Sequence, residues 1–192
     1  KILDRHGNLL YKIYRGQNRT LVELEEIPLF LRQATIAIED AQFYQHHGFS
    51  WRGIIRSFYR NLFLGRLSGG STITQQLVKN ALLTPERTWL RKIKEGILAI
   101  WVETKFSKDE ILQMYFNEVP YGGTSYGIAQ ASQTYLAKDI KNVSLAEGAL
   151  LAGLPAAPTR FSPFGANPKL ALIRQHQVLD AMEKDGYITK EQ

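Results

Sequence analysis

Apolar residues recur at a helical period along most of the chain, at spacings of three and four residues. This pattern predicts helices over residues 28–43, 72–83, 88–106 and 167–185. In the first of them, Leu31, Ala34 and Ile38 fall on one face, which we expect to be buried. Ser-x-x-Glu patterns at residues 107–110 and 144–147, each a capping box, predict the starts of two further helices.

The N-terminal residues follow an alternating pattern instead. Two short apolar runs, residues 2–3 and 9–13, flank a turn with glycine and asparagine, which predicts a short N-terminal β-hairpin. Residues 118–127, with three glycines, and residues 155–168, with four prolines, resist helix assignment, and loops of this length are often functional. No repeat or linker divides the chain, so the sequence predicts one mainly α domain over residues 1–192.

The positive charge of the chain is concentrated in one block. The formal net charge is +6, yet nine Lys or Arg face a single acid, Glu86, between Trp51 and Lys94. Such a block implies an anionic partner, which is nucleic acid, anionic lipid headgroups or a phosphorylated substrate, unless it is simply a solvated basic face. The absence of cysteine excludes disulfides and thiolate chemistry.

The start of the chain leads us to expect a piece of a longer protein. The chain begins with Lys1 and shows no signal segment. No run approaches the roughly 18 to 20 apolar residues that a spanning helix needs. We therefore expect a fragment whose membrane anchor lies upstream.

Three carboxylates are candidates for catalysis. Glu39 and Asp40 end an apolar helical run, and adjacent carboxylates there suit general-base work unless the helix end faces solvent. Glu95 follows Arg91 by four residues and Lys92 by three, so these side chains share a helix face. That geometry suits either a surface ion-pair stripe or a carboxylate that organises cations around a diphosphate.

Residues 69–80 form the most informative string. A Gly-Gly pair followed by Ser-Thr places backbone N–H groups at a helix N-terminus, where anions bind. Gln76, Lys79 and Asn80 then share one helix face, which suits sugar hydroxyls and phosphate, unless it is only an exposed polar face. The spacing of a Walker loop is absent.

The segment from Trp51 to Leu64 mixes arginines with aromatic and aliphatic side chains and contains no acid. It resembles an interfacial membrane segment, and a core helix with a basic outer edge is the alternative. His46 and His47 have no partner at metal-ligand spacing, so they are weak evidence for a metal site.

Five motifs, in this order, resemble those of the peptidoglycan glycosyltransferase family, a domain found alone or at the N-terminal side of class A penicillin-binding proteins. The motifs are Glu39-Asp40-x-x-Phe43-x-x-His46-x-Gly48, Gly70-Ser71-Thr72-Ile73-Thr74-Gln75-Gln76-Leu77-x-Lys79-Asn80, Arg91-Lys92-x-x-Glu95, Lys108-x-x-Ile111-Leu112-x-x-Tyr115-x-Asn117 and residues 174–182. The match spans nearly the whole chain. The second motif is highly specific, whereas the fifth departs from the family, because Arg174-Gln175 stands where two basic residues are usual.

The resemblance implies a mainly α, lysozyme-like fold with a larger lobe and a smaller lobe near the membrane. It implies that a glycan on undecaprenyl diphosphate is the donor, and that the 4-hydroxyl of the N-acetylglucosamine of lipid II is the acceptor, with inversion. The implied partners are lipid II, the nascent glycan strand and the membrane surface through the segment from Trp51 to Leu64, but not nucleic acid. The implied location is the outer face of the bacterial cytoplasmic membrane, and whether a transpeptidase domain follows stays open.

The resemblance also implies roles for single residues. Glu39 is the general base, and Glu95 is the second carboxylate of the catalytic site. The implied substrate-binding residues are Asp40, Phe43, His46, Ser71, Thr72, Gln75, Gln76, Lys79, Asn80, Arg87, Arg91 and Lys92. Lys79, Arg87 and Arg91 neutralise the leaving diphosphate in this scheme. Asp40 either tunes Glu39 or assists a divalent cation, Mg²⁺ or Mn²⁺, and no other cofactor is implied.

Two functions of other classes compete with this interpretation. A lysozyme-type hydrolase also needs two carboxylates across a sugar-binding cleft, but not the cluster of cations. A non-enzymatic module that binds nucleic acid or an anionic membrane leaves Glu39 and the glutamine-rich face unexplained. Salt-dependent binding to DNA discriminates between them, because it should be weak and unspecific if the glycosyltransferase interpretation is right.

Overall fold

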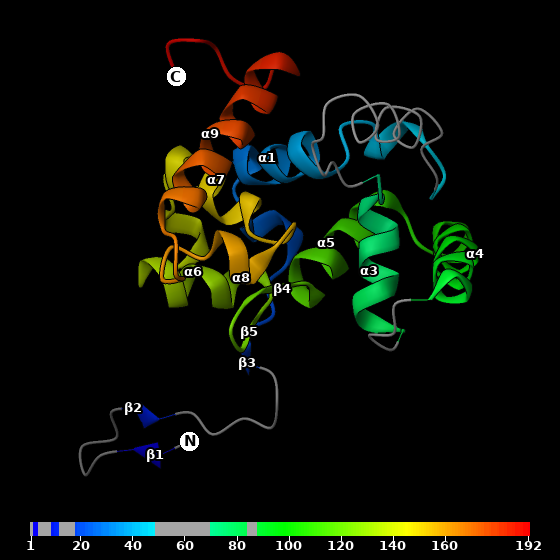
Figure 1. Ribbon diagram of the computed structural model, residues 1–192, viewed down its shortest axis with the longest axis horizontal. Coiled ribbons are helices and arrows are strands. Elements are labelled where there is room, and N and C mark those ends of the chain that lie inside the picture. The colour runs from blue at the N-terminus through cyan, green and yellow to red at the C-terminus, as the bar shows by residue number, and fades with distance from the viewer. Residues whose placement is uncertain (1, 4–8, 12–17, 49–69, 84–87) are drawn as a thin grey trace.

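The computed structural model describes residues 2–3, 9–11, 18–48, 70–83 and 88–192. The expected N-terminal turn, the segment from Trp51 to Leu64 and Arg87 lie outside the described residues. Within the described part, the chain is mainly helical, which confirms the predicted fold class (Figure 1).

The helices and strands follow one another in a simple order. The α-helices are α1 (Leu29–Glu39), α3 (Ile73–Ala81), α4 (Trp89–Lys105), α5 (Lys108–Glu118), α6 (Ile128–Leu136), α7 (Leu145–Gly153), α8 (Pro158–Phe161) and α9 (Lys169–Lys184). The 3-10 helices are η1 (Leu24–Glu26), η2 (Phe43–Gln45) and η3 (Ile140–Asn142), and the strands are β1 (Ile2–Leu3), β2 (Leu9–Tyr11), β3 (Asn18–Arg19), β4 (Pro120–Gly122) and β5 (Ser125–Tyr126). β1 and β2 pair antiparallel, which confirms the predicted hairpin. β5 pairs antiparallel with β4 and parallel with β3, in a small sheet that the sequence did not predict.

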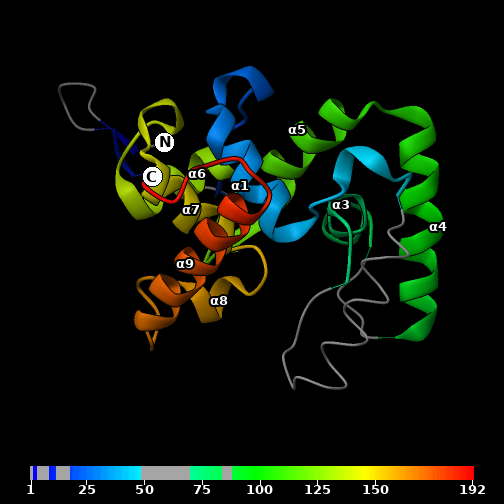
Figure 2. The ribbon, with the colours of Figure 1, turned by 90° about the horizontal axis from the view of Figure 1, so that it is seen from above.

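The helices gather in two groups, which Figure 1 and Figure 2 show on opposite sides of α5. In the larger group, α1, α7 and α9 pack against one another, and α6 and α8 pack onto them. In the smaller group, α3 packs against both α4 and α5. The two-lobed arrangement expected of the chain is therefore found, with α5 between the lobes.

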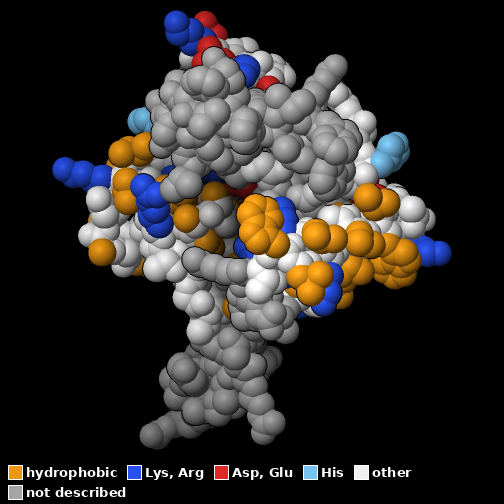
Figure 3. Space-filling view, turned by 45° about the vertical axis from the view of Figure 1, so that its right-hand side comes forward, with side chains coloured by type: hydrophobic (Ala, Val, Ile, Leu, Met, Phe, Trp, Pro, Cys, Tyr) orange, Lys and Arg blue, Asp and Glu red, His pale blue; other side chains and the backbone are white. Residues whose placement is uncertain are grey.

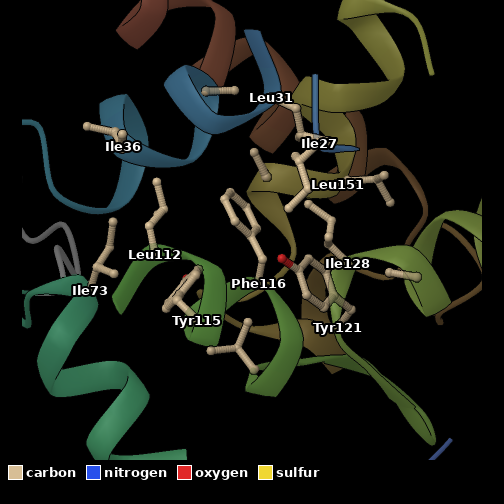
Figure 4. Packing of buried hydrophobic residues seen from close by; sticks show 14 of the residues in the cluster. Ile27, Leu31, Ile36, Ile73, Leu112, Tyr115, Phe116, Tyr121, Ile128 and Leu151 are labelled. Carbon is tan, nitrogen blue, oxygen red and sulfur yellow. The ribbon is translucent and has the colours of Figure 1, made fainter. Parts of the chain in front are cut away.

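The interior forms around α5. Its Ile111, Leu112, Tyr115 and Phe116 are fully buried, and Figure 4 shows the last three packed among side chains from the neighbouring helices. Truncating a buried aromatic residue such as Phe116 to alanine costs about 3–5 kcal/mol, so these contacts fix α5 firmly. Because Ile73 of α3 belongs to the same cluster, the core also fixes the start of α3.

Capping boxes set the starts of three of the described α-helices. Those predicted at residues 107–110 and 144–147 are both present, and a third at residues 72–75 begins α3. In each box, the N-cap side chain and the side chain three residues later satisfy backbone N–H groups reciprocally. Losing such an N-cap typically costs about 1 kcal/mol.

The first predicted helix was wrong at its end. α1 ends at Glu39 rather than near Phe43, because Asp40 leaves helical geometry with φ −159° and ψ 72°. Phe43 belongs to η2 instead. Ile36 takes the fully buried position expected of Ile38, which is only partly buried.

The two segments that resisted helix assignment differ from each other. Residues 118–127 form β4, β5 and their turn, as a non-helical segment should. Residues 155–168 contain α8, because Pro158 stands in its first turn, where no N–H is required. Among the described helices, none is both long and apolar enough to cross a membrane.

Candidate active site

Glu39 is the last residue of α1 and contacts both groups of helices. Its carboxylate is largely buried, with 8% of the side chain exposed. Oε1 accepts a hydrogen bond from Nη2 of Arg174 on α9 at 3.0 Å, and Oε2 accepts one from Nε2 of Gln76 on α3 at 2.8 Å. Each lobe therefore contributes one donor to the same carboxylate.

The amide of Gln76 is oriented by Tyr115 of α5. The Tyr115 hydroxyl donates to Oε1 of Gln76 at 3.4 Å, a weak bond by its length. Burial, and after it the charge of Glu39, raises the pKa of Tyr115 well above its usual value. The hydroxyl therefore keeps its proton, and the amide presents its oxygen to Tyr115 and its nitrogen to Glu39.

Asp40 is bonded by protein groups. Its Oδ1 and Oδ2 lie 2.9 and 2.8 Å from Nε2 of His46, and Oδ2 also accepts the backbone N–H of Ile73 at 3.1 Å. Ile73 is the first residue of α3, so Asp40 meets the positive end of that helix. Phe43 is fully buried and packs edge-on against His46. Asp40, Phe43 and His46 thus hold the end of α1 to the start of α3.

These contacts bear on the two alternatives for Asp40. Both of its carboxylate oxygens already face protein donors, which favours a role in supporting the end of α1 beside Glu39. Across the described residues, no group of three or more His, Asp or Glu side chains is placed to hold a metal ion.

Thr72 and Gln75 are buried at the start of α3. The Thr72 hydroxyl accepts the backbone N–H of Gln75 at 3.2 Å and donates to the carbonyl of Gly48 at 3.0 Å. Gly48 has a φ of +75°, and a Cβ there would lie 3.0 Å from the carbonyl oxygen of Ala99 on α4. The polar groups of Thr72 and Gln75 are therefore engaged in placing α3 against this glycine.

Lys79 and Asn80 lie exposed on the outer side of α3. Asn80 donates from Nδ2 to the backbone carbonyl of Gln76 at 2.8 Å. Ile73 and Leu77, on the opposite side of the helix, are buried, as the amphipathic pattern predicts. The charge of Lys79 is therefore open to an anionic ligand.

Glu95 lies on the inner face of α4, and only 2% of its side chain is exposed. Nη1 of Arg91 donates to Oε2 at 2.9 Å, and Nζ of Lys92 donates to Oε1. Nζ of Lys92 also donates to Oγ of Ser71 at 2.8 Å. A buried carboxylate excludes the surface ion-pair stripe, and leaves Glu95 as an internal counter-charge for two cations.

The start of α3 connects the two carboxylates. Ser71, just before the helix, meets Lys92 and through it Glu95, whereas Gln76 meets Glu39. Ser71 and Gln76 are only five residues apart in the sequence. The fold therefore brings both predicted carboxylates to one short stretch of chain at the start of α3.

Sequence reasoning assigned no role to Arg174, which contacts Glu39 directly. Arg174 shares its face of α9 with the buried Ala171, Val178 and Met182. A charged residue on an apolar helix face is rarely buried without a partner, so this pattern could have marked Arg174. The other predicted cation of the site, Arg87, lies outside the described residues.

Comparison with known proteins gives consistent matches. Residues 6–183 match the family model described as Transglycosylase. The chain is 43% identical to penicillin-binding protein 1F of Bacillus subtilis (strain 168), over 98% of this chain and 26% of that protein. It is 44% identical to penicillin-binding protein 1A of Escherichia coli (strain K12), over 100% of this chain and 22% of that protein.

A solved structure is also similar. The crystal structure of penicillin-binding protein 1A from Haemophilus influenzae matches with a TM-score of 0.55 and 26% sequence identity. The match covers 92% of this chain and 17% of that chain. The chain thus spans about a quarter or less of the length of the relatives that it matches.

Proposed function

The chain belongs to the transglycosylase family, and we propose that it is a peptidoglycan glycosyltransferase domain that polymerises lipid II. The donor is a growing glycan on undecaprenyl diphosphate, and the acceptor is the 4-hydroxyl of the N-acetylglucosamine of lipid II. The observation that carries the proposal is the buried carboxylate of Glu39, with Arg174 and Gln76 each donating to one of its oxygens.

Glu39 acts as the general base in this proposal. It takes the proton of the acceptor hydroxyl while that oxygen bonds to the anomeric carbon, and the diphosphate leaves with the electron pair of the broken C–O bond. Each carboxylate oxygen has two lone pairs, so the bonds from Arg174 and Gln76 leave capacity for the hydroxyl. A positioned general base contributes about 10²–10⁴-fold. Attack opposite the leaving group inverts the anomeric centre.

Lys92 is suited to receive the leaving diphosphate. Its ammonium group has three N–H bonds, and among the described residues Glu95 and Ser71 accept two of them, which leaves one to donate to a phosphate oxygen. The Lys92 side chain is 46% exposed, which gives a ligand access to it. We assign Lys79 the same neutralising role, and Arg87 on the resemblance alone. Losing one such charge typically lowers the rate on the order of 10²–10³-fold.

One face of α4 supports a contact with the membrane surface. The exposed apolar residues of this face are Trp89, Leu90, Ile93, Ile97, Ile100 and Trp101. Figure 3 shows apolar side chains gathered in a band with Lys and Arg at its margins. The exposed Lys94 and Lys105 belong to the same helix. An apolar face flanked by basic residues is typical of a helix that lies in the headgroup region of an anionic bilayer.

We therefore propose that α4 rests on the outer face of the bacterial cytoplasmic membrane. The test is co-sedimentation with vesicles of phosphatidylglycerol and phosphatidylcholine. Because burying one large apolar side chain contributes about 1.5–3 kcal/mol, Ile97→Ser should lower binding roughly ten-fold or more. Phe164→Ser is the control, since Phe164 is 72% exposed but lies outside α4. Equal binding of wild type and both variants would contradict this contact.

The reaction itself is tested by offering labelled lipid II and preformed glycan strands separately, in detergent. We expect polymer from lipid II and no cleavage of the strands. Cleavage of the strands without polymer from lipid II would mean that the chain is a lysozyme-type hydrolase, and that the cations beside Glu95 do not receive a leaving diphosphate.

A further inference from the structure

Arg174 is a charged residue on an otherwise apolar helix face. Ala171, Val178 and Met182 flank it at helical spacing and are buried. Only 15% of the Arg174 side chain is exposed. A cation in such a place needs a partner, and Nη2 of Arg174 donates to Oε1 of Glu39 at 3.0 Å, across 135 residues of sequence.

The rest of the Arg174 side chain is held by contacts with Gly153 and Phe161. A Cβ on Gly153, at the end of α7, would lie 2.8 Å from Cγ of Arg174, so the glycine leaves the space through which the side chain passes. Nε of Arg174 donates to the carbonyl of Gly153 at 3.3 Å. The guanidinium carbon lies 5.5 Å from the ring centroid of Phe161 on α8, within cation–π range. Three helices therefore fix one guanidinium against Glu39.

We propose that Arg174 is a positioning residue, which holds the Glu39 carboxylate in the orientation that accepts the proton of the acceptor hydroxyl. Gln76 fixes the other oxygen from the opposite lobe. The inference rests on the proposed function, because it concerns how the base of that reaction is oriented. Displacing a reacting group by about 1 Å can lower the rate on the order of 10²-fold.

The experiment compares kcat and KM for lipid II polymerisation in the wild type, Arg174→Met and Arg160→Met. Arg160 is a matched control, because its guanidinium also lies over the Phe161 ring, at 5.7 Å, but is exposed and makes no contact with Glu39. Arg174→Met should lower kcat on the order of 10²-fold and change KM by less than about three-fold. Arg160→Met should retain the kcat of the wild type.

Two further variants separate positioning from folding. Arg174→Lys keeps the charge without the planar fork, and should recover part of the kcat lost in Arg174→Met. Gly153→Ala does not replace Arg174, but its new Cβ would lie 2.8 Å from Cγ of Arg174, so the Arg174 side chain must shift. Gly153 has no left-handed φ, so alanine fits its backbone, but the overlap with Cγ of Arg174 should lower the melting temperature. We therefore compare kcat at a temperature at which Gly153→Ala is folded, and expect it to fall there.

Each outcome has a distinct meaning. A raised KM with an unchanged kcat in Arg174→Met would overturn the inference, because Arg174 would then bind substrate. Equal kcat in Arg174→Met and Arg160→Met would also overturn the inference about Arg174. If both of these variants still form polymer, the proposed function stands. No polymer from the wild type and the Arg160 variant would overturn the proposed function, and the inference with it.

Discussion

α4 carries two buried carboxylates eight residues apart, and replacing each by glutamine separates a catalytic charge from a structural one. The side chains of Glu95 and Glu103 are 2% and 3% exposed. Glu95 is held by two cations of its own helix. Glu103 pairs with Lys108 at 2.7 Å and accepts the hydroxyl of Thr74. Glu103→Gln is therefore the matched control for Glu95→Gln.

The expected loss of stability is similar for the two variants. Removing one partner of a fully buried ion pair costs about 3–5 kcal/mol. Part of the Lys92 and Lys108 side chains reaches water, and glutamine keeps one acceptor, so we expect a loss of about 2 kcal/mol in each variant. For a domain of this size, that lowers Tm by roughly 4–8 °C.

The two variants should differ in activity. Glu95→Gln removes the counter-charge that holds Arg91 and Lys92, so polymerisation of lipid II should fall on the order of 10²-fold. Glu103→Gln should stay within about three-fold of the wild type. The assay is urea unfolding for stability, followed by polymerisation at a temperature at which all forms are folded. An equally inactive Glu103→Gln, or a fully active Glu95→Gln, would refute the assignment of Glu95 to the site.

Three further predictions concern buried or paired side chains. Tyr115→Phe removes a donor to Gln76 and should lower kcat about two- to ten-fold, which polymerisation kinetics check. Tyr121→Phe should leave the free energy of unfolding unchanged or raise it, because the buried Tyr121 hydroxyl has no hydrogen-bond partner among the described residues. Urea unfolding checks the second prediction. The hydrogen bond from Lys138 lowers the pKa of Glu147 from 4.5 to about 2, so the carboxylate stabilises the fold above about pH 4.5 and loses this effect as pH falls toward 2. Glu147→Gln should therefore lower stability at pH 7 by about 0.5 kcal/mol, after screening by water, and the Tm difference from the wild type should narrow below pH 4.

The parts of the fold with local signals were predictable from the sequence. The capping boxes that begin α5 and α7 each span four residues, so both starts were found. The end of α1 was missed because its cause is remote: Asp40 leaves the helix and accepts the N–H of Ile73, 33 residues away. Local helix propensity cannot predict such a long-range contact.

The outward face of α4 shows a second limit. Ile93 and Ile97 recur at helical spacing, which predicts a helix but does not say whether the apolar face meets a core or another phase. Both residues are exposed, and the buried positions on α4 are Glu95, Ala99 and Val102. The spacing of apolar residues therefore predicted the helix, but not what its apolar face contacts.

The candidate site was also predictable only in part. The motifs pointed to Glu39 and Glu95, but their partners depend on the fold. Gln76 and Lys79 were expected to share one ligand-binding face of the helix. In the structure, Gln76 donates to the largely buried Glu39, whereas Lys79 is exposed. Arg174 reaches Glu39 from 135 residues away, a pairing that no spacing rule can supply.

The most direct test of the account is the rate of glycan formation from labelled lipid II by the wild type and by Glu39→Gln. Glutamine has nearly the shape of glutamate and can still accept the hydrogen bond from Arg174, but it cannot take a proton. If Glu39 is the general base, the wild type forms polymer and the folded variant does so at a rate at least about 10²-fold lower. A Glu39→Gln variant that polymerises lipid II within about three-fold of the wild-type rate would contradict the central claim.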